Sequence, residues 1–417
     1  ASYGLSGNQE IGLYRSLASY ALNNYYYADG IAPGLAPERL ANPDLTWETT
    51  RQFDIGMEIG LFKDRIQLTA DYYNKQTTDL LLEVPVPYTS GFATTFQNIG
   101  SVENKGLELS LYTVNVTKGK FLWTSNINIS FNENKVLSLG DANEFTVTGI
   151  GENRNDYIVR VGEPIGSMYG FIWDGIYNYD DFVEFEGLSN AEAAGLMEDF
   201  DRTTDTFTPK EGVVTRAGVT RFRPDVIKFK DINGDGVVDT DDRTIIGNPW
   251  PKHFGGFSNN FTYGGFDLSV FMTWSYGNDI YNNNLVRGQA TAIPFFNKFG
   301  FIRDRWTPEN PDTDVISIWG GGDGGTSDIN STLYIEDGSY LRVSNITFGY
   351  TVPRNKINKI GLKGLRIYVA GDNLHVWTNY TGYDPDVSVG NNQLTPGLDF
   401  DSYPRMRTYR VGAHIDF

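Results

Sequence analysis

The last residues of the chain alternate between apolar and polar side chains with a period of two. The apolar members are Tyr409, Val411, Ala413, Ile415 and Phe417, and the residues between them are Thr408, Arg410, Gly412, His414 and Asp416. A period of two is the spacing of a β-strand whose two faces meet different surroundings. It suits a membrane-barrel strand, apolar outside and polar inside, and equally a half-buried strand of a soluble sheet, so the neighbouring segments have to decide.

The same alternation recurs along the chain and predicts ten strands in all. Beside the last segment, the predicted strands are 52–61, 65–72, 107–111, 121–131, 257–263, 266–274, 346–350, 365–369 and a less regular one over 13–27. Aromatic residues make up 14% of the chain and there are 46 glycines, which favours strands and turns over helices.

The connections between the predicted strands alternate in length. Those over 62–65, 114–120, 264–265 and 351–364 are short or moderate, whereas those over 76–99, 132–253, 277–339 and 376–404 are long. Short turns on one side and long loops on the other are typical of an outer-membrane barrel, with the short turns in the periplasm. A soluble sandwich or propeller would not be expected to alternate in this way. The fold class is therefore predicted as all-β, an antiparallel transmembrane β-barrel with long extracellular loops.

Composition narrows the class further. The chain has 417 residues without a dividing linker, no apolar run near eighteen residues, and an N-terminus without the features of an export signal, which is expected to be removed or not included. The absence of cysteine excludes disulfides and thiol chemistry, and a net charge of −18 argues against nucleic acid as a partner. Residues 132–252 hold 23 Asp and Glu against 12 Lys and Arg. The segment 132–253 is therefore predicted to be a large, acidic, solvated extracellular insertion.

Within that insertion, residues 231–242 carry oxygen ligands at the spacing of an EF-hand calcium loop. Positions 1, 3, 5, 7, 9 and 12 are Asp231, Asn233, Asp235, Val237, Asp239 and Asp242, with Gly236 at the sharp turn. Asp242 stands where a glutamate is usual. The alternative is an acidic turn closed by its own side-chain hydrogen bonds, so Ca²⁺ is a possible cofactor rather than a required one.

No residue pattern predicts catalysis, and the chain is predicted not to be an enzyme. The three histidines, His253, His375 and His414, lack metal-ligand spacing, and the acid pairs Asp180/Asp181 and Asp384/Asp386 are explained by the abundance of acids. Aromatic residues over 274–276 could form an interfacial girdle or fill a core. Trp306, Trp319, Tyr334 and Trp377 in the long loops could stack on cargo or pack the loops, so no substrate site is assigned.

Several motifs, in order, resemble the C-terminal half of SusC/RagA-type TonB-dependent outer-membrane transporters. They are GEPIGSMYG (162–170), DGIY (174–177), DINGDG (231–236), IIGNP (245–249), the strand pair 257–276 followed by GNDIYN (277–282), and YLRVSNITFGY (340–350). The resemblance runs from about residue 42 to residue 417. It implies a barrel of roughly 22 strands that is plugged by an N-terminal domain and lies in the outer membrane of a Gram-negative bacterium.

The resemblance also implies a function and partners. Members of the family import oligosaccharides or peptides with energy from TonB, under a SusD-like surface lipoprotein that acts as a lid. No plug domain or TonB-contacting segment is found in this sequence, and ten strands cannot close a barrel of that size, so the remainder of the barrel and the plug are expected from the same or another chain. Phe417 resembles the terminal aromatic read by the barrel-assembly machinery, and Phe417→Ala is expected to lower insertion. The alternatives are a passive porin and a secreted, calcium-dependent glycan-binding protein.

Overall fold

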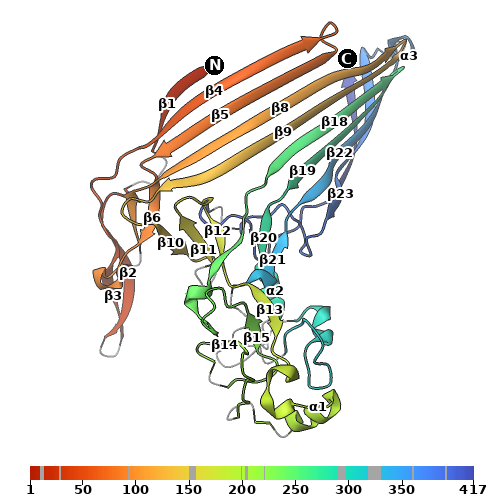
Figure 1. Ribbon diagram of the computed structural model, residues 1–417. Helices are drawn as coiled ribbons and strands as arrows, with labels where there is room; N and C mark the ends of the chain where they lie inside the picture. The colour runs from red at the N-terminus through yellow and green to blue at the C-terminus, as the bar shows by residue number, and fades with distance from the viewer. Residues whose placement is uncertain are drawn as a thin grey trace.

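Ten strands form one large antiparallel sheet in the computed structural model of the chain (Figure 1). The structure describes residues 1–9, 14–27, 30–92, 94–149, 156–198, 200–201, 205–219, 221–289, 297–317, 330–358, 361–389 and 392–417. In order across the sheet, the strands are β1 (Ser2–Asn8), β4 (Glu48–Leu61), β5 (Ile66–Thr78), β8 (Ser101–Lys118), β9 (Phe121–Ser138), β18 (His253–Tyr263), β19 (Phe266–Tyr276), β22 (Tyr340–Thr351), β23 (Gly364–Thr378) and β25 (Thr408–Asp416). None of the described helices is long and apolar enough to cross a membrane.

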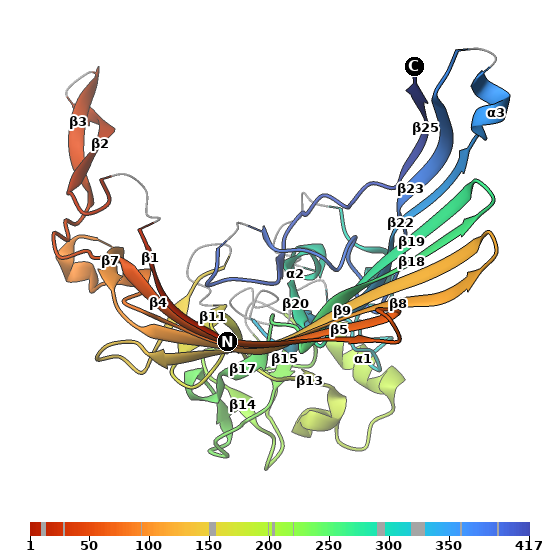
Figure 2. The same ribbon diagram turned by 90° about the horizontal axis from the view of Figure 1, so that it is seen from above.

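Nine of the predicted strands lie in this sheet, and the prediction over 13–27 is wrong in its placement. β2 (Ser19–Tyr27) pairs with β3 (Gly30–Arg39) in a hairpin that stands apart from the sheet, as Figure 2 shows. The sheet instead begins with β1, where Tyr3 pairs with Phe53 of β4. β1 was missed because it is short and its apolar alternation, Tyr3 and Leu5, ends at Gly7.

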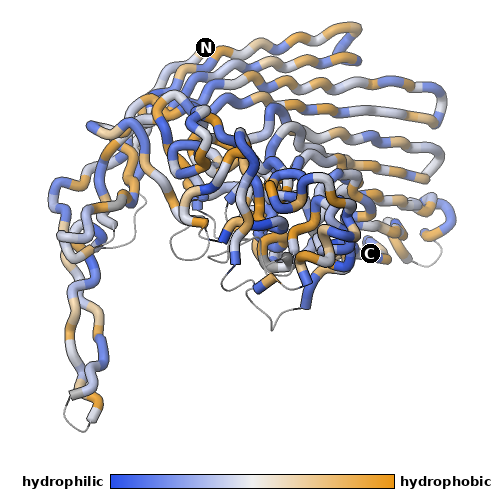
Figure 3. Tube along the Cα trace, turned by 60° about the horizontal axis from the view of Figure 1, so that its bottom comes forward, coloured by the Kyte–Doolittle hydropathy of each residue, from blue (hydrophilic) through white to orange (hydrophobic). Residues whose placement is uncertain are grey.

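The register sorts side chains onto two faces, visible as alternating colours along the strands in Figure 3. One row of paired residues is mainly apolar: Met57, Ala70, Leu109, Ile129, Gly255, Trp274, Leu341 and Trp377. The adjacent row is mainly polar: Glu58, Thr69, Ser110, Asn128, Gly256, Thr273 and Arg342. We call the two sides of the sheet the apolar face and the polar face. In a membrane barrel the apolar face meets lipid and the polar face lines the interior.

The predicted alternation of connection lengths is confirmed. At one end of the sheet the connections are 62–65, 119–120, 264–265 and 352–363, which contains helix α3 (Arg354–Ile357). At the other end they are 9–47, 79–100, 139–252, 277–339 and 379–407, of which the first was not predicted because β1 was missed. Gly264 and Gly265 both have positive φ (58° and 106°), which lets two residues close the β18–β19 hairpin. We call the two ends the short-turn end and the loop end.

The long connections carry short elements of their own. These are β6 (Leu81–Pro85), β7 (Thr94–Asn98), β10 (Glu144–Val147), β11 (Tyr157–Arg160), β12 (Ser167–Gly170), β13 (Trp173–Ile176), α1 (Asn190–Glu198), β14 (Thr215–Arg216), β15 (Ile227–Phe229), β16 (Val237–Val238), β17 (Thr244–Gly247), β20 (Asp279–Asn282), α2 (Asn283–Gln289), β21 (Ile335–Asp337) and β24 (Leu398–Asp399). The sheet order β10-β11-β12-β17 lies within one connection, whereas β21-β20-β24 joins two. Pairing across connections shows that they fold together.

The described residues of 139–252, 277–339 and 379–407 pack as one unit, which we call the loop body. One cluster of buried residues takes members from all three connections: Tyr157, Met168, Tyr281, Val286, Tyr334 and Leu398. Another places Trp306 against the aromatic side chains of residues 177–222. A third reaches the sheet through Val102 and Val136, which lie on its polar face. The acidic insertion therefore contains a packed hydrophobic core, which the prediction of a solvated excursion did not foresee.

The two faces of the sheet should differ in how well they tolerate a charged side chain, and this difference tests the architecture. We expect Leu109→Arg in the full-length protein to reduce the amount of folded barrel, because an arginine on the lipid side costs roughly 2–4 kcal/mol near the bilayer midplane. The adjacent Ser110→Arg, on the polar face, is the matched control and should fold normally. Heat-modifiable gel migration of outer-membrane fractions measures both. Equal loss in the two variants would contradict the assignment of the faces.

Candidate functional site

The candidate functional site is the polar face of the sheet together with the loop body at its loop end. Arg342 of β22 points from the polar face to Asp384 in the connection that follows β23. Nη1 donates to Asp384 Oδ2 at 3.1 Å, and Nη2 donates to Oδ1. The two residues are 4% and 6% exposed. A bidentate pair this deeply buried fixes the last long connection onto the sheet.

Further ion pairs run across the polar face toward the short-turn end. Arg366 of β23 donates through Nε to Asp267 of β19 at 3.1 Å. Asp372 accepts from Arg410 of β25 at 3.0 Å and from the Asn345 amide at 2.7 Å. These charges therefore pair with one another across β19, β23 and β25, and Asn345 of β22 adds a neutral hydrogen-bond partner.

The motifs that carry the family resemblance meet inside the loop body. Asn248 of the IIGNP motif donates its backbone N–H to Asp279 Oδ2 at 2.7 Å, and the N–H of Asp279 donates to the carbonyl of Asn248 at 2.8 Å. Burial raises the pKa of the Asp279 carboxyl, while the Asn248 hydrogen bond lowers it in part. Gly170, which ends the GEPIGSMYG motif, lies where a Cβ would come within 2.4 Å of the Asn330 carbonyl oxygen. These residue types are explained by close packing between connections.

A hydrogen-bonded polar group is buried at the centre of this packing. The Tyr281 hydroxyl donates to Asn330 Oδ1 at 2.8 Å, and the Asn330 amide donates to Asp156 Oδ1. Nearby, the Tyr380 hydroxyl donates to Asp399 Oδ2 at 2.5 Å, and burial together with that hydrogen bond raises the pKa of Tyr380 well above its ordinary value. The first group joins the connections 277–339 and 139–252, and the second joins two parts of the connection 379–407. Both therefore hold the loop body together.

The predicted calcium loop is closed by its own side chains. Asp231 accepts the N–H groups of Gly234 and Gly236 at 2.6 and 2.8 Å, while Asn233, Asp235 and Asp239 each accept the N–H two residues further on. Val237 lies on β16 and is 38% exposed. Within the described part of the chain, no three or more His, Cys, Asp or Glu side chains are grouped as a metal site. Calcium binding at 231–242 stays a prediction.

Asp242 anchors the end of this loop. Its Oδ1 accepts the N–H of Ile232 at 2.7 Å and its Oδ2 accepts the N–H of Asp239 at 2.8 Å. Burial alone would raise the pKa of Asp242, but the backbone hydrogen bonds outweigh it and the pKa lies below its usual value. Because the folded pKa is lowered, the ionised form stabilises the loop above the ordinary carboxyl pKa, and this stabilisation is lost as the pH falls through the lowered value.

The other residues singled out in the sequence have structural places. Trp306 and Tyr334 are each 1% exposed in the loop body and so pack the loops, whereas Trp377 is 51% exposed on the apolar face. Trp319 lies outside the described residues. His253 and His375 lie on the apolar face, and His414 lies on the polar face beside Asp416, 3.1 Å away. Asp181, Asp384 and Asp386 pair with Lys228, Arg342 and Arg405.

Arg342 and Asp384 are the pair that sequence reasoning missed. The only local signal was a charged residue inside the otherwise apolar start of YLRVSNITFGY, at a position that the alternation places on the polar face. A lone arginine there needs a carboxylate partner, but 42 residues separate it from Asp384. Sequence alone could therefore have flagged Arg342 but not its partner.

An open sheet of long antiparallel strands with one apolar face, a polar face and a folded assembly at one end defines an outer-membrane β-barrel wall with its extracellular loops. The chain belongs to the family described as "TonB dependent receptor-like, beta-barrel", which matches residues 12–374. It is homologous to SusC- and RagA-type transporters and lies in the outer membrane of a Gram-negative bacterium.

Specific relatives agree with this family. The chain is 34% identical over its whole length to TonB-dependent receptor P3 of Formosa agariphila and 26% identical to TonB-dependent receptor SusC of Bacteroides thetaiotaomicron, covering 39% and 37% of those proteins. A solved structure of the RagAB peptide transporter matches the whole chain with a TM-score of 0.74 at 26% identity, and 40% of that structure's chain is covered. The chain thus spans about two fifths of the length of these relatives. They are receptors and transporters, not enzymes.

Breaking the Arg342–Asp384 pair tests the attachment of the loop body. Arg342→Met leaves the Asp384 carboxylate buried without its partner, which typically costs 3–5 kcal/mol, or roughly a hundredfold or more in local opening. We expect hydrogen exchange in residues 379–389 of the full-length protein to accelerate accordingly. Arg342→Met combined with Asp384→Leu should recover part of the loss.

The exposed Arg405–Asp386 pair in the same connection supplies the control. The side chains are 50% and 38% exposed, so Arg405→Met should change exchange by no more than the roughly 0–1 kcal/mol of a surface pair. If Arg342→Met and Arg405→Met have the same small effect, the buried pair does not hold the connection.

Proposed function

We propose that this chain forms the C-terminal part of the barrel of a TonB-dependent outer-membrane importer that takes up a nutrient, either an oligosaccharide or a peptide. The observation that carries the proposal is the ten-stranded sheet itself: its apolar face suits lipid, and its polar face, with ion pairs across neighbouring strands, suits the wall of a lumen. The family of the chain and the naming of its relatives as receptors and transporters support import.

The two edge strands of the sheet, β1 and β25, indicate that further strands pair with this part of the barrel wall. Among the described residues, β1 pairs only with β4 and β25 only with β23. In lipid an unpaired strand edge leaves N–H and C=O groups unsatisfied, each at a cost of several kcal/mol. Further strands, with a plug inside the completed barrel, therefore pair with β1 and β25. They come from the same or another polypeptide.

The loop body supports regulated entry rather than an open pore. It is anchored to the polar face by Arg342–Asp384 and by the cluster around Val102 and Val136. A packed assembly at the loop end narrows the mouth and offers a firm surface to a SusD-like lid lipoprotein. Opening the plug then takes work delivered by TonB from the periplasm. A passive porin needs neither partner.

Nutrient-dependent growth tests the proposal. We expect deletion of the full-length gene to abolish growth on one nutrient class when oligosaccharides and peptides are supplied separately, and loss of TonB to have the same effect. Complementation with the intact gene should restore growth. Uptake that persists without TonB would contradict the importer and favour a porin. Co-purification of a surface lipoprotein from detergent extracts tests the lid.

We also propose that residues 231–242 bind Ca²⁺. The spacing of their oxygen atoms supports this proposal. Extracellular calcium modules have dissociation constants near 10⁻⁴–10⁻³ M, so we expect several millimolar CaCl₂, relative to EGTA, to slow hydrogen exchange of the Gly234 and Gly236 amides. Asp235→Ala should remove this response. Asp241→Ala, at a position that supplies no ligand in such loops, is the control. No calcium-dependent change in the wild type would leave only the self-closed turn. The role of Phe417 in assembly likewise stays a prediction.

A further inference from the structure

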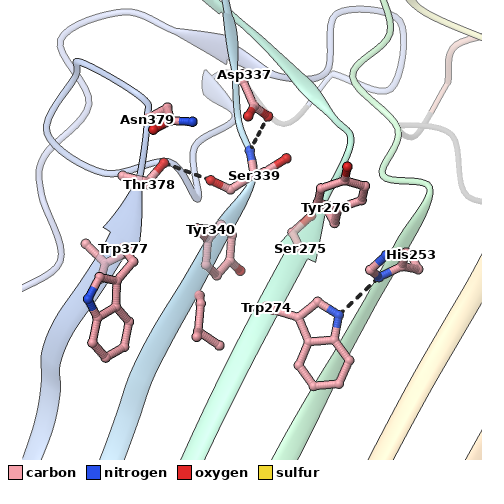
Figure 4. A pocket seen from close by; sticks show the side chains of 12 residues that line it. His253, Trp274, Ser275, Tyr276, Asp337, Ser339, Tyr340, Trp377, Thr378 and Asn379 are labelled. Carbon is pink, nitrogen blue, oxygen red and sulfur yellow. Dashed lines mark hydrogen bonds between the residues drawn. The ribbon is translucent and has the colours of Figure 1, made fainter.

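A hollow of about 740 Å³ opens on the apolar face at the loop end of β18, β19, β22 and β23 (Figure 4). Five of the residues that line it lie on the apolar face, which is not the lumen side: His253, Trp274, Tyr276, Leu341 and Trp377. The lining also includes Ser275, Tyr340, Val376 and Thr378, which belong to rows of the polar face at the loop end. The hollow continues the apolar rows that face lipid. The chemistry of its lining differs from those rows, because it combines aromatic rings with hydroxyl, amide and carboxylate groups.

The floor of the hollow is a row of three side chains. Trp274 of β19 pairs with Leu341 of β22, which pairs with Trp377 of β23. Neighbouring strands lie about 4.8 Å apart, so the two tryptophans stand about 10 Å apart with a smaller side chain between them. One flat ring needs about 3.5–4 Å of contact distance on each of its two sides. The space above the shorter Leu341 side chain, between the two tryptophans, therefore suits a single ring or hydrocarbon chain.

The aromatic wall on the β18 side is held in place. His253 stacks on Tyr276 with ring centroids 5.0 Å apart and an interplanar angle of 18°, and Phe131 lies 5.7 Å from His253 on its other side. Trp274 Nε1 donates to His253 Nδ1 at 3.2 Å. Because the indole N–H already has an acceptor within the protein, the wall presents ring faces to a ligand.

Polar groups close the loop-end side of the hollow. The N–H of Ser339 donates to Asp337 Oδ1 at 2.9 Å, and Thr378 Oγ1 donates to the Ser339 carbonyl at 2.8 Å. Among the described residues, none donates a hydrogen bond to the second Asp337 oxygen or pairs with the Asn379 amide. This Asp337 oxygen can accept a hydrogen bond from a hydroxyl group, and the Asn379 amide can donate one to a hydroxyl oxygen. None of the described residues that line the hollow is a lysine or arginine, so its chemistry suits hydroxyls and disfavours phosphate.

We propose that this hollow binds a glycosylated lipid of the outer leaflet. The sugar ring lies between Trp274 and Trp377, its hydroxyls bond to Asp337 and Asn379, and the acyl chains run along the apolar face toward the short-turn end. The occupant is a lipid because the hollow is continuous with the lipid-facing surface of an outer-membrane barrel. The inference is independent of the nutrient that the barrel imports.

Native mass spectrometry of the full-length protein in mild detergent tests the site. The probes are monogalactosyl diacylglycerol, phosphatidylethanolamine and phosphatidylglycerol with the same acyl chains. We expect the galactolipid to bind at least tenfold more tightly than either phospholipid. Trp377→Ala should weaken that binding roughly two- to tenfold, the range for one aromatic contact. Asp337→Asn should reduce the preference for the galactolipid while leaving the phospholipids unchanged or tighter.

Trp123→Ala is the matched control. Trp123 lies on the same apolar face nearer the short-turn end, where it stacks on Phe261 at 5.5 Å and donates to Asn259 Oδ1 at 2.9 Å. The Trp123→Ala variant should leave galactolipid binding unchanged. The proposal is overturned by equal binding of the three lipids, by equal losses in Trp123→Ala and Trp377→Ala, or by a free galactoside that binds as tightly as the galactolipid. Asp337→Asn keeps the test decisive if Trp377→Ala folds poorly.

Discussion

Backbone hydrogen bonding across ten strands is the constraint on which the rest of this structure depends. Inside a bilayer no water replaces a missing partner, so each N–H and C=O along these strands has to be satisfied by a neighbouring strand. The ladder that results fixes the register, and the register fixes which side chain faces lipid. A slip of one residue between β8 and β9 would move Leu109 and Ile129 off a common apolar row and place polar neighbours there instead.

The polar face uses this register to hold the loop body. Arg342 and Asp384 meet only because β22 presents the arginine on that face at the loop end, and Val102 and Val136 join the nearby apolar cluster in the same way. The sheet thus positions three long connections whose own elements are too short to be stable alone. Their glycines permit close approach, as at Gly166, where a Cβ would come within 2.5 Å of Pro396.

Much of the wall could be predicted from the sequence because a two-residue period is a local signal. Long alternating strands such as β4 and β9, and the tight turn at Gly264 and Gly265, are features that such local signals predict. β1 escaped because its apolar signal is only Tyr3 and Leu5, while β2 was misplaced because alternation does not reveal which strand is the neighbour. The partners of Arg342 and of Asp279 were beyond reach because contacts between distant connections leave no trace in local spacing. Trp377 shows the same limit, since its residue type does not say whether it packs or faces outward.

The distance between the two edge strands tests most directly whether this sheet is one sector of a larger closed barrel. The chain has no cysteine, so single cysteines at Gly4 of β1 and Val411 of β25 can carry spin labels in the full-length protein without background from this part. Ten strands spaced about 4.8 Å apart along a large barrel place the two labels on the order of 30 Å or more from each other. Double electron–electron resonance should report that separation. A distance near 5–10 Å would mean that the ten strands close on themselves and would contradict the account.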